Sequence, residues 1–169
     1  PCWHPDGDRL LLAHGARGEA AIYDAADGHA VRVYRGHTGF VIDATIDPAG
    51  ARGASSAVDS SVRIFELETG RLLERTVGLP MAGSAIAFGP AGRLLSYTSN
   101  EHFLLDASPG ASLAEIANLA RASRQEELRL HADGKHFWIR DAEQRIRLFD
   151  LDAAAEGARA MARPVLPQD

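Results

Sequence analysis

The sequence predicts an all-β fold in which one small antiparallel unit is repeated four times. The first observation behind this prediction is a glycine-bearing turn that recurs every 42 or 43 residues. The second is a large apolar residue four positions before each of these glycines. The turn glycines are Gly7, Gly50, Gly92 and Gly134, and the apolar residues before them are Trp3, Ile46, Phe88 and Leu130.

A third periodic feature is a short run of strand-forming residues that ends in an acidic residue. Its four copies keep in phase with the turns, and a further turn glycine follows each copy after a few residues. A repeat of this length is typical of a β-propeller, whose blades are four-stranded antiparallel sheets. The copies are Ala21–Asp24, Arg63–Glu66, Phe103–Asp106 and Arg147–Asp150.

The second repeat shows the expected strands most clearly. Its runs of strand-forming residues are bounded by Gly, Pro, Asp or Ser, which favour turns. We expect the innermost strand of each repeat to be the most apolar, because it lines the packed centre of the fold. The expected strands of this repeat are 40–46, 54–57, 62–65 and 71–75.

Segment 112–129 departs from this composition. Its Ala, Leu and Glu content favours a helix, whereas the phase of the repeat predicts an outer strand, a loop and an inner strand. We follow the repeat. The whole chain is then a partial propeller with approximate repeats at 1–36, 37–78, 79–120 and 121–169.

Composition and charge argue against some classes of partner, namely membranes and nucleic acids. The chain has 169 residues, of which 46% are hydrophobic and 24% charged, as in an ordinary soluble domain. It shows no apolar run of membrane-spanning length, no signal peptide at its start and one cysteine, Cys2, so we expect a cytoplasmic protein without a membrane partner. The net charge of −5 argues against a nucleic-acid partner. Its richness in Ala, Arg and Gly suggests a bacterial origin.

The motifs of the second repeat come in a recognisable order. Gly36-His37 precedes the innermost strand, the turn Asp47–Gly50 follows that strand, and the run Ser55–Glu66 comes next. This order resembles the WD-repeat family of β-propellers, whose last motif reads Ser-Gly-Ser-x-Asp-x-Thr-Val-x-x-Trp-Asp. The other three repeats match the pattern less well.

The resemblance implies a structural polar network in the second repeat. His37 is expected to lie over Asp59, with Ser55 on the neighbouring strand, because a buried imidazole needs a partner for each ring nitrogen. Phe65 stands where the family has a Trp whose indole N–H donates into the network. The resemblance therefore implies an incomplete network with a weaker stabilising role.

The number of repeats also bears on the assembly. Rings of this family usually contain about seven or eight blades, so four repeats are too few to close one. Two explanations stay open: the chain is part of a longer propeller, or two chains join into one ring. In both, further blades of the same or another chain are partners.

No sequence pattern points to catalysis, a cofactor or a metal. The chain has no Gly-x-Ser-x-Gly turn for a nucleophile and no glycine-rich phosphate loop. His131 and His136 do not have a recognised metal-ligand spacing. We therefore predict a non-enzymatic protein without a cofactor or a bound metal.

Two functions stay open. The first is a protein–protein interaction scaffold or sensor module of a larger regulatory protein, because rigid propellers present many loops for recognition. The second is the substrate-gating propeller of a prolyl-oligopeptidase-type hydrolase, to which the third repeat, Ala87–Ser99, is similar. For the first function, the expected partner-binding residues are Arg17, Phe40, Ser60, Arg124 and Gln144.

Overall fold

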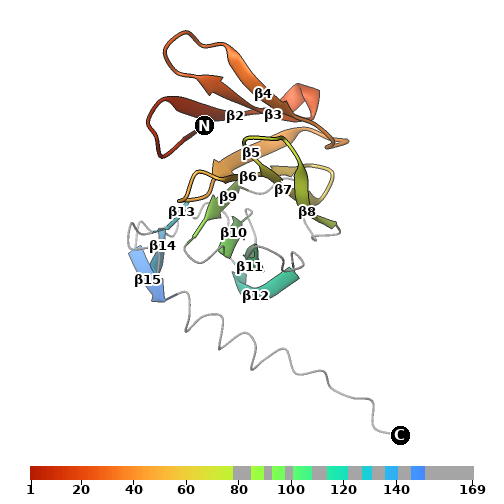
Figure 1. Cartoon of the computed structure of the whole chain (residues 1–169). Coiled ribbons are helices and arrows are strands. Elements are labelled where there is room, and N and C mark those ends of the chain that lie inside the picture. Colours follow the sequence, from red (N-terminus) through yellow and green to blue (C-terminus); the bar gives the residue numbers. More distant parts are fainter. Residues whose placement is uncertain are drawn as a thin grey trace, which may run out of the picture.

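The chain folds into four antiparallel sheets that follow one another along the sequence (Figure 1). The only helical element among the described residues is a short 3₁₀ turn, η1 (Gly15–Arg17). The fold is therefore all-β, as the periodic turns predict. The structure, a computed structural model, describes residues 1–77, 85–89, 93–97, 101–107, 114–121, 127–130, 136–140 and 146–150.

Each sheet is built from strands that are consecutive in the sequence, so that neighbouring strands pair in antiparallel order. The first sheet contains β1 (Cys2–Trp3), β2 (Arg9–His14), β3 (Glu19–Asp24) and β4 (Ala30–Tyr34). The second contains β5 (Val41–Ile46), β6 (Arg52–Ala57), β7 (Ser61–Glu66) and β8 (Leu72–Val77). The third contains β9 (Ala85–Phe88), β10 (Arg93–Tyr97), β11 (Glu101–Asp106) and β12 (Ala114–Arg121).

The fourth sheet shows three described strands, where the repeat predicts four. They are β13 (Glu127–Leu130), β14 (His136–Arg140) and β15 (Ile146–Asp150), and residues 151–169 lie outside the described part. The ambiguous segment 112–129 contains β12 and the start of β13, so the prediction of strands there is confirmed. Pairing of β12 with β11 overrides the helix propensity of its residues. The repeat boundaries themselves stay a prediction.

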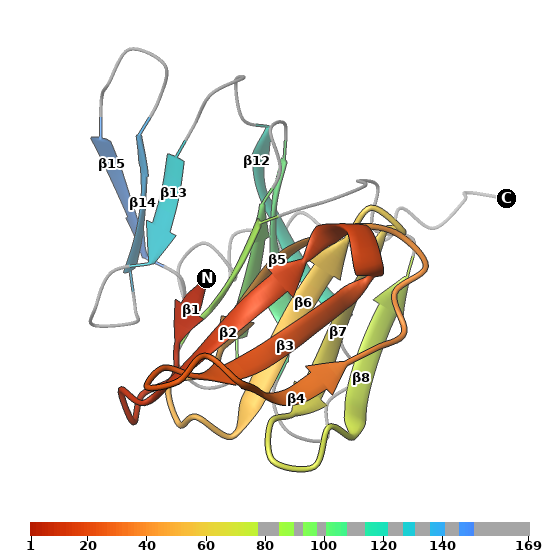
Figure 2. The ribbon, with the colours of Figure 1, turned by 90° about the horizontal axis from the view of Figure 1, so that it is seen from above.

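Neighbouring sheets are held together by apolar packing that repeats from one pair to the next. Ile46 of β5 shares a buried cluster with Leu11 and Ile22 of the first sheet, which Figure 2 shows lying over the second. Phe88 of β9 shares another with Ile64 and other residues of the second sheet. The innermost strand of each of these sheets thus packs on the middle strands of the sheet before it.

Trp3 stands at the same position of its repeat as Ile46 and Phe88, yet it is 60% exposed, whereas they are 7% and 8% exposed. Ile46 and Phe88 each belong to a buried cluster between neighbouring sheets, and Trp3 belongs to neither cluster.

The start of β5 also departs from the expected packing. Phe40, just before β5, and Ile42 of β5 are 57% and 48% exposed, although the innermost strand is expected to line the packed centre of the fold. Further along β5, Cys2 of β1 lies beside Thr45, with Sγ and Oγ1 3.9 Å apart.

This packing predicts different effects for two isoleucines of one strand. Ile46→Ala should lower the free energy of unfolding by about 2–5 kcal/mol, because it opens a cavity between the first two sheets. Ile42→Ala is the matched control and should change it by less than about 1 kcal/mol. Urea denaturation of both variants measures the difference. Equal losses would contradict the inter-sheet packing described above.

Candidate functional site

Three short segments meet at one end of the first two sheets: η1 with its cap Gly18, the β4–β5 loop and the β6–β7 turn. Gly18 lies in the left-handed region (φ 64°), and a Cβ atom there would stand 2.8 Å from the His37 carbonyl oxygen. A Cβ atom on Gly39 would stand 2.5 Å from Val58 Cγ2. Glycine at both positions therefore allows the three segments to pack closely on one another.

The structure brings together the three residues that the family resemblance names. His37 Nδ1 lies 3.1 and 3.2 Å from the two carboxylate oxygens of Asp59, and Nε2 lies 2.9 Å from Ser55 Oγ. Because a carboxylate only accepts, the Nδ1–H donates to Asp59, and Nε2 accepts from the Ser55 hydroxyl. The His37 and Asp59 side chains are 2% and 8% exposed, so their polar atoms depend on partners within the protein.

The Asp59 carboxylate also accepts hydrogen bonds from other donors. The backbone N–H of Thr38 donates to it at 2.9 Å. Ser61 donates through its backbone N–H at 3.1 Å and through its hydroxyl at 2.7 Å. Ser61 was not predicted as a site residue, although it stands at the Thr position of the family pattern. Asp59 thus ties the β6–β7 turn to the β4–β5 loop.

These contacts set the ionisation of the pair. Burial alone would raise the pKa of Asp59, but hydrogen bonds from Ser61, Thr38 and His37 outweigh burial and lower it to about 2. Burial is the larger effect on His37 and lowers its pKa, and the Asp59 charge offsets only part of this. At neutral pH the pair is a neutral imidazole beside an ionised carboxylate. Both imidazole nitrogens are engaged, so His37 is not placed to act as a general base.

A hollow of about 240 Å³ lies between η1 and the β4–β5 loop, and His37 is part of its lining. Arg17 and Phe40, two of the predicted partner-binding residues, line it as well. The Arg17 side chain is exposed, and its guanidinium makes no hydrogen bond or ion pair with any other residue that the structure describes. The hollow therefore offers an exposed aromatic ring and an unpaired positive charge.

The other predicted partner-binding residues lie elsewhere. Ser60 is half-buried in the β6–β7 turn, with a φ of 59° and its N–H donating to the Ala57 carbonyl at 3.2 Å. It is not part of the lining of the hollow. Arg124 and Gln144 fall outside the described residues. Of the five, the structure brings Arg17 and Phe40 together.

Phe65, at the Trp position of the family pattern, has a packing role. Its ring stacks on that of Tyr34 from the first sheet, with centroids 3.9 Å apart and planes at 19°. The Tyr34 hydroxyl donates to the Leu67 carbonyl at 2.8 Å, and burial raises the pKa of Tyr34 to about 12. The position thus joins two sheets instead of donating to the His37 network.

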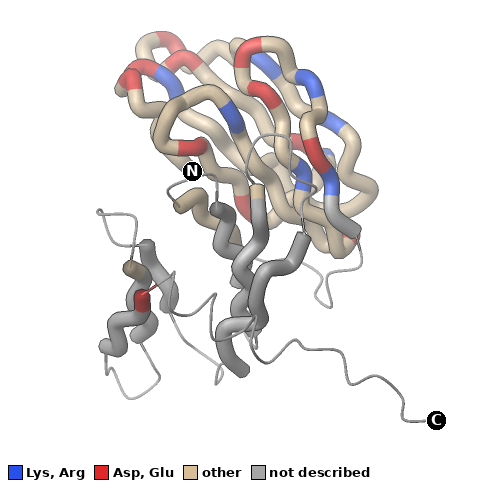
Figure 3. Tube along the Cα trace, turned by 60° about the horizontal axis from the view of Figure 1, so that its bottom comes forward, with Lys and Arg blue, Asp and Glu red and all other residues tan. Residues whose placement is uncertain are grey.

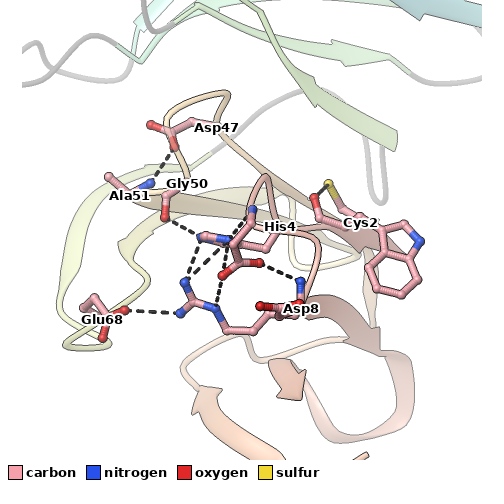
Figure 4. A network of polar contacts seen from close by, with 10 residues as sticks. Cys2, His4, Asp8, Asp47, Gly50, Ala51 and Glu68 are labelled. Carbon is pink, nitrogen blue, oxygen red and sulfur yellow. Dashed lines mark hydrogen bonds and ion pairs between the residues drawn. The ribbon is translucent and has the colours of Figure 1, made fainter. Parts of the chain in front are cut away.

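A second polar network, which the sequence patterns above do not indicate, joins the turns of the first two sheets (Figure 4). The His4 Nε2–H donates to the Gly50 carbonyl at 2.9 Å. Arg9 donates to Asp6 at 2.8 Å and to Glu68 at 3.2 Å. These contacts link the β1–β2 turn to two turns of the next sheet.

Arg52 makes the corresponding contact one sheet further along. It donates to Asp47 of its own turn at 3.0 Å and to the carbonyl of Ala107, after β11. A signal for this network is present in the sequence, because a basic residue follows each turn glycine by one or two positions. These residues are Arg9, Arg52, Arg93 and Lys135.

Asp24, Asp27 and His29 are a possible group of metal ligands in the described part of the chain, with ligand atoms within 4.8 Å of one another. His29 Nδ1 lies 2.6 Å from Asp27 Oδ1, and both side chains are exposed. Hydrogen bonds from His29 lower the pKa of Asp27, and the same pairing raises that of His29. An exposed ion pair accounts for this proximity without a metal.

Basic and acidic residues are interspersed over the first two sheets (Figure 3). This mixed surface differs from the clustered basic patch that is typical of nucleic-acid binding. In the part of the chain that the structure describes, no helix is long and apolar enough to cross a membrane.

The His37 network predicts a loss of stability on truncation. His37→Ala should lower the free energy of unfolding by about 1–3 kcal/mol, because the Asp59 carboxylate stays buried without one of its donors. His29→Ala, at an exposed histidine, is the control and should stay within about 0.5 kcal/mol of the wild type. An unchanged urea midpoint for His37→Ala would show that the network does not contribute to stability.

The same network predicts a pH dependence. The lowered pKa of His37 contributes stability above about pH 6.5 that is lost as the pH falls below it. The Asp59 pKa of about 2 contributes stability that is present above about pH 3.9 and is lost as the pH falls toward 2. Urea denaturation of Asp59→Asn should therefore give a shallower acid limb below about pH 4 than the wild type. An identical acid limb would overturn this assignment.

Known relatives match part of the chain, and no family model matches it. The chain is 32% identical over 97 residues to eukaryotic translation initiation factor 3 subunit I of Neurospora crassa. It is 31% identical over 97 residues to the subunit of the same name from Pyricularia oryzae. Both matches cover 57% of this chain, which spans 28% of the length of each relative.

A third relative is WD repeat-containing protein SL1-17 of Schistosoma mansoni, 39% identical over 67 residues, which are 40% of this chain and 22% of that protein. These relatives are eukaryotic, so the bacterial origin that the composition suggests stays a prediction. They are also WD-repeat proteins at modest identity. These relatives support the resemblance to WD-repeat proteins, and the antiparallel four-stranded sheets are consistent with the blades of a WD-repeat propeller.

Proposed function

We propose that the chain is a non-catalytic scaffold that binds another protein through the hollow between η1 and the β4–β5 loop. The observation that carries this proposal is the unpaired Arg17 guanidinium beside the exposed Phe40 ring. Arginine and aromatic residues are enriched where protein interfaces gain most of their affinity. Both stand on loops that buried contacts hold in place, which limits the entropy lost on binding.

The relatives favour the same function. Two of them are named as subunits of a translation initiation factor, and WD-repeat relatives imply protein partners in general. We propose that the chain acts within a larger regulatory protein in the cytoplasm, where further blades of the same or another chain complete the ring. The 28% coverage of the translation factor subunits favours this arrangement.

The relatives do not support the alternative of a prolyl-oligopeptidase-type propeller. The geometry of His37 favours a non-catalytic role, because Asp59 and Ser55 occupy both ring nitrogens. Its side chain is also almost fully buried. We therefore propose a structural role for His37, Ser55 and Asp59, which hold the loop that presents Phe40.

The proposal predicts that two variants weaken partner binding. Affinity purification with the full chain should recover a protein partner, and Phe40→Ala or Arg17→Glu should reduce its recovery about tenfold, because each removes a contact in the hollow. Quantitative mass spectrometry of the recovered protein measures the change.

Val31→Ala and Arg71→Glu are the matched controls, since Val31 and Arg71 are exposed and do not line the hollow. Both should retain the partner. The proposal is overturned if the Phe40 and Arg17 variants retain it equally, or if the chain by itself turns over a substrate.

A further inference from the structure

We propose that the hollow binds an acidic, extended segment of the partner protein. One partner carboxylate is bound by the Arg17 guanidinium, and a neighbouring apolar side chain packs on Phe40. This inference rests on the proposed function, because it names the chemistry of the segment that the same hollow takes.

The charge of the hollow favours an anionic group. Arg35, which precedes the hollow on the β4–β5 loop, is paired with Glu19 at 2.8 Å. Arg63 of β7 donates to the Gly36 carbonyl. Arg17 differs from both, since it has no described partner. A carboxylate can accept two parallel hydrogen bonds from a guanidinium, which makes it a strong complement to this side chain.

The apolar part of the site favours an extended segment. Phe40, just before β5, lines the hollow, and Ile42 of β5 lies two residues further along the chain outside the lining. Both side chains are about half exposed, so apolar surface is available next to the hollow. The hollow itself holds about 240 Å³, less than the roughly 300–1,000 Å³ of typical small-molecule sites. This space suits one or two side chains of a peptide better than a cofactor.

The walls of the hollow are preorganised, and Arg17 is the charged side chain that lines it. His37 is uncharged at neutral pH, so Arg17 is the cation of the lining. The close approach of Gly18 to the His37 carbonyl fixes the two walls relative to each other. A segment that binds here therefore does not have to order the loops first.

The same features disfavour a nucleic acid as the occupant. Nucleic-acid binding gains its affinity from several phosphate contacts at once. The lining contains one arginine and no lysine, and the chain carries a net charge of −5. A peptide carboxylate needs only one guanidinium.

Fluorescence anisotropy on the full chain tests the inference. The probe is a labelled short peptide in which Glu alternates with Leu, and its partner probe carries Gln in place of Glu. The Glu peptide should bind more tightly than the Gln peptide by about tenfold, the effect of one charge-assisted pair. Arg17→Gln should remove this difference, and Arg71→Gln, an exposed arginine away from the hollow, should keep it.

Arg17→Glu supplies a second measurement, because it should reverse the preference in favour of a peptide that alternates Lys with Leu. The inference is overturned if Arg17→Gln leaves the Glu preference intact, or if single-stranded DNA binds more tightly than the Glu peptide at the same salt concentration. If these peptides fail while the purified partner still depends on Phe40 and Arg17, the proposed function stands and the peptide chemistry is wrong. If the partner depends on neither residue, the proposed function itself is wrong.

Discussion

The buried carboxylate of Asp59 is the constraint on which the candidate site depends. An ionised carboxylate with 8% exposure must be surrounded by donors. Here the donors come from His37, Thr38 and Ser61, so satisfying one charge connects the β4–β5 loop to the β6–β7 turn. The loop is thereby held where it borders the hollow. The hydrogen bonds that the buried Asp59 carboxylate needs therefore fix the position of a loop at the surface.

Close backbone packing also fixes the position of this loop relative to the first sheet. Gly18 allows η1 to approach the His37 carbonyl, and Gly39 allows the loop to approach Val58. Beneath these contacts, Tyr34 stacks on Phe65 and Ile46 packs with Leu11 between the two sheets. The hollow is therefore formed by two sheets together, and its walls depend on both the polar network and the apolar core.

The sequence predicted most of the fold, because turn glycines and strand runs recur at fixed spacing whatever packs around them. It predicted that β12 is a strand against its helix propensity, and it named His37, Ser55 and Asp59 through a family pattern. It did not predict the exposure of Phe40 and Ile42, because burial depends on which strand lies alongside. The sequence did not predict the hollow either, because its two walls come from different sheets and meet only through a close backbone approach.

The repeat itself explains why Arg17 is available at this hollow. Arg17 lies 42 residues before Asp59 and stands at the same position of its repeat. The position equivalent to Ser55 in the first repeat is Leu12, because Leu12 pairs with Ala21 as Ser55 pairs with Arg63. Leucine offers no hydroxyl, so a buried carboxylate there would lack that part of its network. In the first repeat this position has no such structural role, and its residue, Arg17, carries an exposed guanidinium. In the second, the same position holds the loop that borders the hollow. The same repeat position therefore has two roles at this site. In the second sheet Asp59 holds the loop, and in the first sheet Arg17 supplies the positive charge.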